Sequence, residues 1–103
     1  MRLFSKMLLI ALLTPLSATA NNEICNSFGN LATTIMEERQ KGILISEMMR
    51  RAETLDTSVK ETAILFVIAA YDRPQYNLPE SRSRAVQRFA NDKMLACYKL
   101  VQN

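Results

Sequence analysis

The first twenty residues constrain the fold more than any other feature, because they have the composition of a removable leader. Arg2 and Lys6 precede an apolar run over residues 7–13, and Ala18-Thr19-Ala20 then places small residues at both ends of a cleavage motif. This order is typical of a secretory signal peptide, and the apolar run is shorter than the ~20 residues that a membrane span requires. The sequence therefore predicts cleavage after residue 20 and export of a chain that begins at Asn21.

The exported chain is expected to form one small domain over residues 21–103. Removal of residues 1–20 leaves 83 of the 103 residues. A domain of this size buries only about 60–65% of the surface that its unfolded chain exposes, so its core alone is marginally stable. Small domains of this kind commonly add a covalent cross-link.

Two cysteines, Cys25 and Cys97, lie close to the two ends of the exported chain. An even count in an exported chain favours a disulfide, and loop entropy would give a ring of this length about 4 kcal/mol of stability. The competing interpretation is a reactive or metal-bound thiol, but two cysteines without any histidine make a poor zinc site, because four ligands are the norm. The sequence predicts a Cys25–Cys97 disulfide, no metal and no cofactor.

The spacing of apolar residues predicts an all-α fold. Apolar residues recur with a helical period over about 23–41, and Gly42 can end this first helix in the left-handed conformation. A shorter helix is expected from a cap at Ser46 to about residue 55. Its expected inner face comprises Met49, Ala52 and Leu55.

Two further helices are expected after this one. Ser58 begins a capping box, and the nine apolar residues 63–71 predict a central helix that is buried nearly all round and ends before Pro74. The last helix is expected to begin near a cap at Asn77, with Pro79 in its first turn. Its expected inner stripe comprises Val86, Phe89, Ala90, Met94, Cys97, Leu100 and Val101.

Four helices with short connections predict a small antiparallel four-helix bundle. In an up-down-up-down order, the start of the first helix and the end of the fourth meet at one end of the bundle. Cys25 and Cys97 would lie there, so the predicted fold and the predicted disulfide agree with each other.

The basic character of the chain derives partly from the leader. Thirteen basic residues less Arg2 and Lys6 leave eleven against ten acidic residues, a net charge of +1, which gives no argument for a nucleic acid partner. Residues 73–103 nevertheless hold six basic and two acidic residues. This basic face is either a solvated helix surface or a docking site for an acidic protein surface or an anionic lipid.

Catalysis is not expected from this composition. The absence of histidine removes the commonest general base, and two glycines cannot form a Gly-rich phosphate loop. Glu37 and Glu38 point about 100° apart on a helix, so they do not face one substrate. The sequence therefore predicts a protein that is not an enzyme.

The first candidate for a functional surface is the segment 71–76, which places two tyrosines and an arginine in a short connection with a proline. Tyr and Arg are the residue types that dominate binding hot spots. Either the two rings close the end of the bundle, or the segment contacts a partner. Together with the basic face of the last helix, the expected partner-binding residues are Tyr71, Arg73, Tyr76, Arg84, Arg88 and Leu95.

Three residues interrupt the amphipathic pattern of the last helix. Arg82 and Lys93 lie on its apolar side. Either their stems run over the edge of the core to water, or one of them is buried against a carboxylate such as Glu23 or Glu61, or faces a ligand groove. Leu95 lies on the charged face, either as an ordinary exposed leucine or as the apolar centre of an interface.

Short motifs recur along most of the mature chain: Cys25, Ala32, Ile35-Met36, Arg39-Gln40-x-Gly42, Ala70-Tyr71, Pro74-x-Tyr76 and Phe89 to Cys97. In this order the chain resembles a loose group of short exported helical proteins of Gram-negative bacteria and their phages. The resemblance implies a periplasmic destination and a helical fold with a terminal disulfide. It implies no activity and no particular site residues.

The expected function is non-catalytic protein binding in the periplasm, as an inhibitor, immunity factor, exclusion factor or small chaperone. The expected partner is a protein of the cell envelope and not a nucleic acid, and no stable membrane span is expected once the leader is cleaved. One alternative is a small-molecule or lipid carrier with a methionine-lined apolar cavity, and another is membrane action through an uncleaved leader. The methionines in question are Met36, Met48, Met49 and Met94, which otherwise serve as flexible core filler.

Overall fold

The chain is all-helical in the computed structural model, which describes the backbone of residues 2–102 and the side chains of residues 20–102. No strand occurs within those residues, so the predicted fold class is confirmed at this level. The four helices are α1 (Arg2–Lys41), α2 (Ile45–Glu53), α3 (Thr57–Tyr71) and α4 (Pro79–Gln102).

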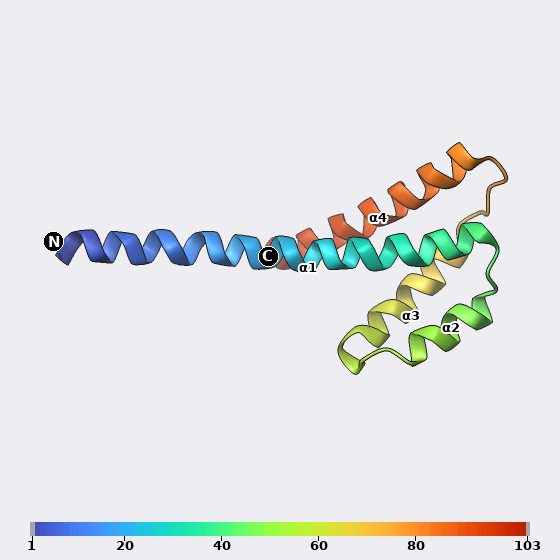
Figure 1. Ribbon diagram of the computed structural model, residues 1–103, viewed down its shortest axis with the longest axis horizontal. Coiled ribbons are helices and arrows are strands. Elements are labelled where there is room, and N and C mark those ends of the chain that lie inside the picture. Colours follow the sequence, from blue (N-terminus) through green and yellow to red (C-terminus); the bar gives the residue numbers. More distant parts are fainter. Residues whose placement is uncertain (1, 103) are drawn as a thin grey trace.

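The longest helix, α1, is the element on which the others assemble. Figure 1 shows α4 running back along the second half of α1, so that the end of α4 lies beside the middle of α1. Helix α3 also packs against α1, and α2 packs against α3. The α1–α2 and α3–α4 connections therefore lie at the same end of the molecule (Figure 1).

The first helix is longer than the sequence predicts but ends where expected. It begins at Arg2 rather than near residue 23, and it continues through Pro15. Gly42 follows with φ +89°. The Gly42 N–H donates to the Arg39 carbonyl and the Ile43 N–H to the Glu38 carbonyl, each at 3.1 Å, which is the Schellman arrangement of a helix C-terminus.

The three predicted cap positions are wrong, and each differs from the observed position by one or two residues. Leu44 and Asp56 occupy the cap positions of α2 and α3, and neither helix has a side-chain capping bond, so Ser46 and Ser58 lie inside the first turns. In α4 the Leu78 carbonyl accepts the Arg82 N–H at 3.0 Å, which makes Leu78, not Asn77, the last residue before the helix. Proline favours the first position of a helix, and this preference of Pro79 outweighs the cap that the Asn77 side chain was expected to provide.

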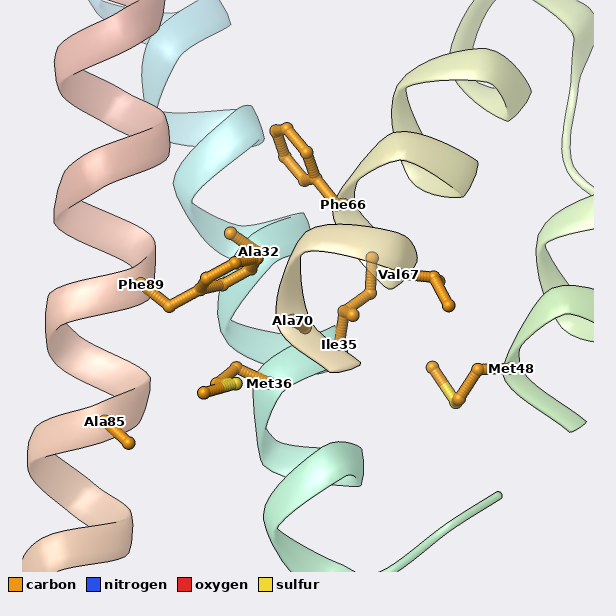
Figure 2. Packing of buried hydrophobic residues seen from close by; sticks show 9 residues of the cluster. All are labelled: Ala32, Ile35, Met36, Met48, Phe66, Val67, Ala70, Ala85 and Phe89. Carbon is orange, nitrogen blue, oxygen red and sulfur yellow. The ribbon is translucent and has the colours of Figure 1, made fainter. Parts of the chain in front are cut away.

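The hydrophobic core lies where α1, α3 and α4 meet, with α2 contributing Met48 at its edge (Figure 2). Phe66 of α3 packs edge-on against Phe28 of α1 and Phe89 of α4, with ring centroids 6.1 and 6.3 Å apart. Edge-on contacts of this kind add to the stability that burial gives. The buried cluster comprises Ala32, Ile35, Met36, Met48, Phe66, Val67, Ala70, Ala85 and Phe89.

The exposed fractions of side chains correct two expectations about which residues of α3 and α4 face the core. Helix α3 is not buried all round, because Leu65 and Ile68 are 65% and 52% exposed. It packs mainly against α1 and α2, and Phe66 meets Phe89 of α4, so the side that carries Leu65 and Ile68 stays exposed. In α4 the predicted core residue Leu100 is 76% exposed, whereas Ala85, which was not predicted, is buried.

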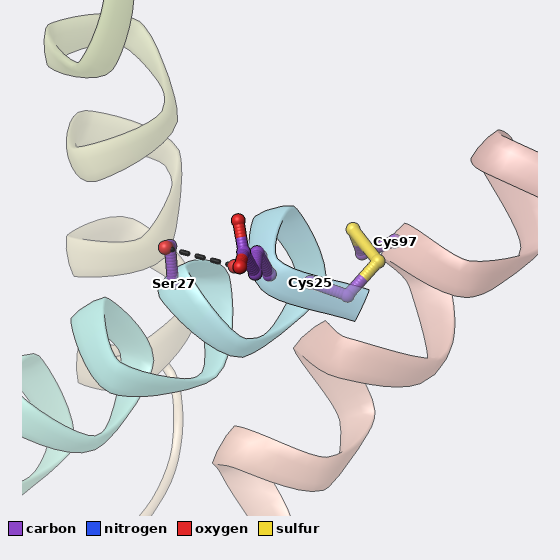
Figure 3. The surroundings of a disulfide bond; sticks show 4 residues. Cys25, Ser27 and Cys97 are labelled. Carbon is purple, nitrogen blue, oxygen red and sulfur yellow. Dashed lines mark hydrogen bonds between the residues drawn. A yellow bond between two sulfur atoms is a disulfide. The ribbon is translucent and has the colours of Figure 1, made fainter. Parts of the chain in front are cut away.

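Figure 3 shows the cysteine pair that joins α1 to α4. The sulfur atoms of Cys25 and Cys97 are 2.12 Å apart and their Cα atoms 5.4 Å apart. Both side chains are buried. The predicted disulfide pair is confirmed as a pair at bonding distance, and it fixes the end of α4 to α1.

Candidate functional site

The α3–α4 loop, residues 72–78, is held to α1 by one buried amide. Gln40 is only 3% exposed. Its Nε2 donates to the Pro74 carbonyl at 3.0 Å, and its Oε1 accepts the Tyr76 N–H at 2.9 Å. A buried polar group is costly unless both of its ends are paired, so these two bonds fix the loop against the end of α1.

Two arginines satisfy further carbonyls of the same loop. Arg39 of α1 donates to the Arg73 carbonyl through Nε and Nη2, at 3.2 and 3.0 Å. Arg82 of α4 donates through Nε to the Tyr76 carbonyl at 2.7 Å. The loop is therefore bonded to both neighbouring helices, and its shape is fixed without any partner.

The Arg73 side chain crosses from the loop to α4. Its Nη2 donates to Asp92 Oδ2 at 2.6 Å, and its guanidinium carbon lies 4.8 Å from the centroid of the Phe89 ring. A guanidinium over an aromatic face gains a cation–π attraction. Arg73 consequently holds the loop to α4 and occupies the carboxylate of Asp92.

Beside this loop lies a pocket of about 290 Å³ between the loop, α4 and the last turns of α1. The lining residues of α4 are spaced as one helix face, at positions 81, 84, 85 and 88. We call this concavity the arginine pocket, because three of its lining side chains are arginines. It is lined by Met36, Arg73, Pro74, Tyr76, Ser81, Arg84, Ala85 and Arg88.

Two of these arginines differ from the third in their partners. Arg84 and Arg88 are exposed, and among the described residues neither forms an ion pair, whereas Arg73 pairs with Asp92. Asp92 would be the natural i,i+4 partner of Arg88, but it is taken by Arg73. The arginine pocket therefore carries two positive side chains, Arg84 and Arg88, that form no ion pair within the described residues.

Four of the six predicted partner-binding residues are brought together at the arginine pocket: Arg73, Tyr76, Arg84 and Arg88. Tyr71 and Leu95 are not among its lining residues. Sequence reasoning placed the four together only by residue type, and the fold supplies the geometry.

Tyr71 has a structural environment instead. Its hydroxyl donates to the Ile43 carbonyl, and the Arg39 guanidinium lies 5.1 Å from its ring centroid. Burial raises the pKa of Tyr71, so the hydroxyl remains a donor at neutral pH. Tyr71 closes the loop end of the helices, as one of the two sequence interpretations expects.

Leu95 is 54% exposed and lies in a separate shallow hollow of α4. The hollow also includes Met94 and Tyr98. Leu95 therefore does not line the arginine pocket.

The two basic residues on the apolar side of α4 have different roles. Lys93 is half-buried, and its Nζ lies 5.6 and 5.2 Å from the ring centroids of Phe66 and Phe89. Within the described residues neither Lys93 nor Arg82 pairs with a carboxylate. Lys93 covers the edge of the aromatic core, and Arg82 bonds the Tyr76 carbonyl.

Sequence reasoning missed four residues that line or support the pocket, namely Gln40, Met36, Ser81 and Ala85. Gln40 was assigned only to a helix terminus, although its amide organises the loop. Met36 and Ser81 line the pocket from α1 and α4. The signal for Gln40 was available in principle, because a glutamine one helical turn after buried Met36 lies on the inner side of α1.

No helix in the described part of the chain is both long and apolar enough to cross a membrane. Nor do the described residues contain a group of three histidine, cysteine, aspartate or glutamate side chains that could hold a metal ion. Comparisons with protein-family models, with curated proteins and with solved structures found no match. The arginine pocket is thus the feature on which a function can be argued.

Proposed function

We propose that the chain is a non-catalytic, periplasmic protein-binding module that acts on a protein of the cell envelope, as an inhibitor, immunity, exclusion or chaperone-like factor. The single observation that carries this proposal is the arginine pocket, where Arg84 and Arg88 lack a carboxylate partner among the described residues. Arginine and tyrosine side chains around a preformed hollow are typical of binding hot spots.

The rigidity of the loop supports a binding role. A surface that is ordered before the partner arrives loses less conformational entropy on association, and so binds more tightly for the same contacts. The bonds of Gln40, Arg39 and Arg82 to the loop provide this order in the free chain. The pocket is therefore ready to accept a group from another molecule.

The proposal includes removal of residues 1–20 and an antiparallel bundle over residues 21–103. Figure 1 shows the first half of α1 extending away from the other helices, so cleavage there would remove no packed partner of α3 or α4. We predict that protein recovered from the periplasm of the native host begins at Asn21, as measured by intact mass. Recovery with an intact leader would favour membrane action instead.

The binding surface is tested with two double variants, each of which removes two positive charges, one variant inside the arginine pocket and the other outside it. Arg84→Gln/Arg88→Gln removes both charges of the arginine pocket, and Lys60→Gln/Lys99→Gln removes two charges outside it. Each tagged chain is expressed in the native host, cross-linked and purified, and the captured envelope proteins are identified by mass spectrometry.

The proposal predicts one envelope protein that wild type and Lys60→Gln/Lys99→Gln capture equally and that Arg84→Gln/Arg88→Gln captures at least about tenfold less, since charged hydrogen bonds contribute about 1.5–3 kcal/mol each. The melting temperatures should stay within about 2 °C of wild type, because exposed charges contribute little to stability. Equal capture by both double variants would show that the pocket is not the contact surface.

A carrier function receives less support from the same structure. An apolar groove of about 170 Å³ lies between α1, α2 and α3. It is smaller than the ~300–1,000 Å³ typical of ligand pockets, and of the four methionines only Met48 lines it. Native mass spectrometry of protein from its own host would revive this alternative if a lipid mass were retained.

A further inference from the structure

We propose that the arginine pocket binds the C-terminal residue of the partner protein, with the terminal carboxylate on Arg84 and Arg88 and the last side chain against the apolar wall. This inference deepens the proposed function and rests on it. It identifies which part of the partner enters the pocket.

The charge of the pocket selects a carboxylate. A guanidinium presents two parallel N–H donors that match the two oxygens of a carboxylate. Arg84 and Arg88 are one helical turn apart on α4 and line the same hollow, so both can approach one anionic group. Arg73 is already bonded to Asp92 and serves as a wall rather than a ligand.

The rest of the lining selects an apolar side chain next to that carboxylate. Pro74 and Tyr76 are exposed and offer accessible apolar surface on the loop side of the pocket, whereas Met36 and Ala85 are buried beneath its floor. At about 290 Å³ the pocket is at the lower limit of ligand sites. The pocket therefore suits one residue that carries both a charge and an apolar group.

A chain terminus meets this requirement better than an internal acidic residue. Along an extended peptide, successive side chains point to opposite sides. An aspartate or glutamate and its apolar neighbour therefore cannot both enter one small pocket. A C-terminal residue carries its carboxylate and its side chain on the same Cα, so both can enter together.

The charges that flank the pocket disfavour a lipid surface. Glu80, Arg84, Arg88 and Asp92 follow one another at intervals of four along α4, so a carboxylate lies at each end of the two arginines. A plane of anionic headgroups would meet this mixed row, whereas a single carboxylate inside the pocket would meet only arginine. The geometry thus favours one localised anion.

The test uses small probes that mimic a terminal residue. N-acetyl-leucine carries the free carboxylate, N-acetyl-leucinamide lacks it, and acetyl-Ala-Glu-Ala-amide carries an internal acid. Each is titrated into the chain as its native host produces it, and binding is followed by NMR through the Nε–H signals of the arginines. Vesicles with 30% phosphatidylglycerol provide the membrane arm.

We expect N-acetyl-leucine to bind at least tenfold more tightly than the amide and the internal acid, and to shift the Arg84 and Arg88 signals. Arg84→Gln/Arg88→Gln should lose this preference, and Lys60→Gln/Lys99→Gln should keep it. Equal affinity for acid and amide, a preference for the internal acid, or vesicle binding that depends on Arg84 and Arg88 would overturn the inference.

Failure of this inference and failure of the proposed function are distinguishable. Suppose that the chain binds N-acetyl-leucine no more tightly than N-acetyl-leucinamide, but that capture of an envelope protein still depends on Arg84 and Arg88. Then the arginine pocket binds the partner, and only the assignment of the partner's C-terminal residue to it is wrong. If N-acetyl-leucine binds as expected but no envelope protein is captured, the pocket is a carboxylate site and the proposed partner class is wrong.

Discussion

The two ends of the α1–α4 pair are closed by different chemistry. At one end the Cys25 and Cys97 sulfur atoms lie at bonding distance, and both residues are buried. At the other end Gln40, Arg39 and Arg82 bond the α3–α4 loop, and the arginine pocket opens beside it. Both ends position α4, and at the second end the exposed Arg84 and Arg88 line a pocket.

The difference indicates how a small domain can separate its stability from the binding proposed for it. A covalent cross-link stabilises without using any surface charge. At the loop end, by contrast, one carboxylate, Asp92, is used to hold Arg73, and the neighbouring Arg88 is left without it. The bonds that order the loop therefore also create the charge imbalance of the pocket.

The largest expected effect comes from breaking the covalent end. Cys25→Ser/Cys97→Ser should lower the free energy of unfolding by about 4 kcal/mol, because the unfolded chain regains the entropy that a ring of this length removes. Urea denaturation of the oxidised wild type and the double variant measures the loss. A change below about 1 kcal/mol would show that contacts between α1 and α4 suffice without the bond.

Breaking the polar end should cost less. Gln40→Leu keeps the volume but leaves the Pro74 carbonyl and the Tyr76 N–H without partners, so we expect a loss of about 2 kcal/mol, since each unsatisfied group costs about 1–3 kcal/mol. The pocket should loosen as well, and N-acetyl-leucine should bind more weakly.

The matched control is Gln87→Leu, an exposed glutamine of α4 whose amide forms one side-chain hydrogen bond within the described residues, to Ser83 at 3.4 Å. We expect its stability to stay within about 0.5 kcal/mol of wild type. Similar losses in the two variants would mean that the buried amide does not organise the loop.

A smaller effect tests how closely the helices approach near the cysteines. A Cβ on Gly29 would lie 2.6 Å from Met94 Sδ and 2.7 Å from its Cγ. Gly29→Ala should therefore destabilise by about 1 kcal/mol, because overpacking outweighs the gain in helix propensity. In a Met94→Ala background the same substitution should become stabilising. If Gly29→Ala changed the stability in the same direction with Met94 and with Met94→Ala, the close approach of Gly29 and Met94 would be contradicted.

The smallest effect lies on α2, which is not part of the α1–α4 pair. Hydrogen bonds from Arg50 and Arg51 lower the pKa of Glu47 to about 2. A lowered folded-state pKa stabilises above the ordinary value of 4.5 and loses that contribution as pH falls toward 2. Glu47→Gln should flatten the fall of melting temperature over this range, mostly at low salt because exposed pairs are screened. An unchanged profile would show that these pairs do not affect stability.

Local signals in the sequence predicted much of the fold. Gly42 ended α1 as expected, because a left-handed residue is a local requirement that glycine meets. The cysteine pair could be predicted as well, because the sequence holds two cysteines and so allows one pairing. The exposed side of α3 could not be predicted, since it depends on which helices surround α3 in space.

The candidate site was predictable only in its residue types. Arg73, Tyr76, Arg84 and Arg88 are predicted to bind a partner from their residue types, but their convergence on one pocket depends on Gln40, which bonds residues 34 and 36 positions away. Such a contact has no periodic signal in the sequence. The competition of two arginines for Asp92 is likewise visible only in the folded chain.

The most direct test of the central claim is photo-crosslinking in the native host, with p-benzoylphenylalanine at position 81 or at position 99. Position 81 lines the arginine pocket without removing either arginine, and position 99 lies near the other end of α4. We predict an adduct with one envelope protein from position 81 and none from position 99. No adduct from position 81, or the same adduct from both positions, would contradict the assignment of binding to the loop end.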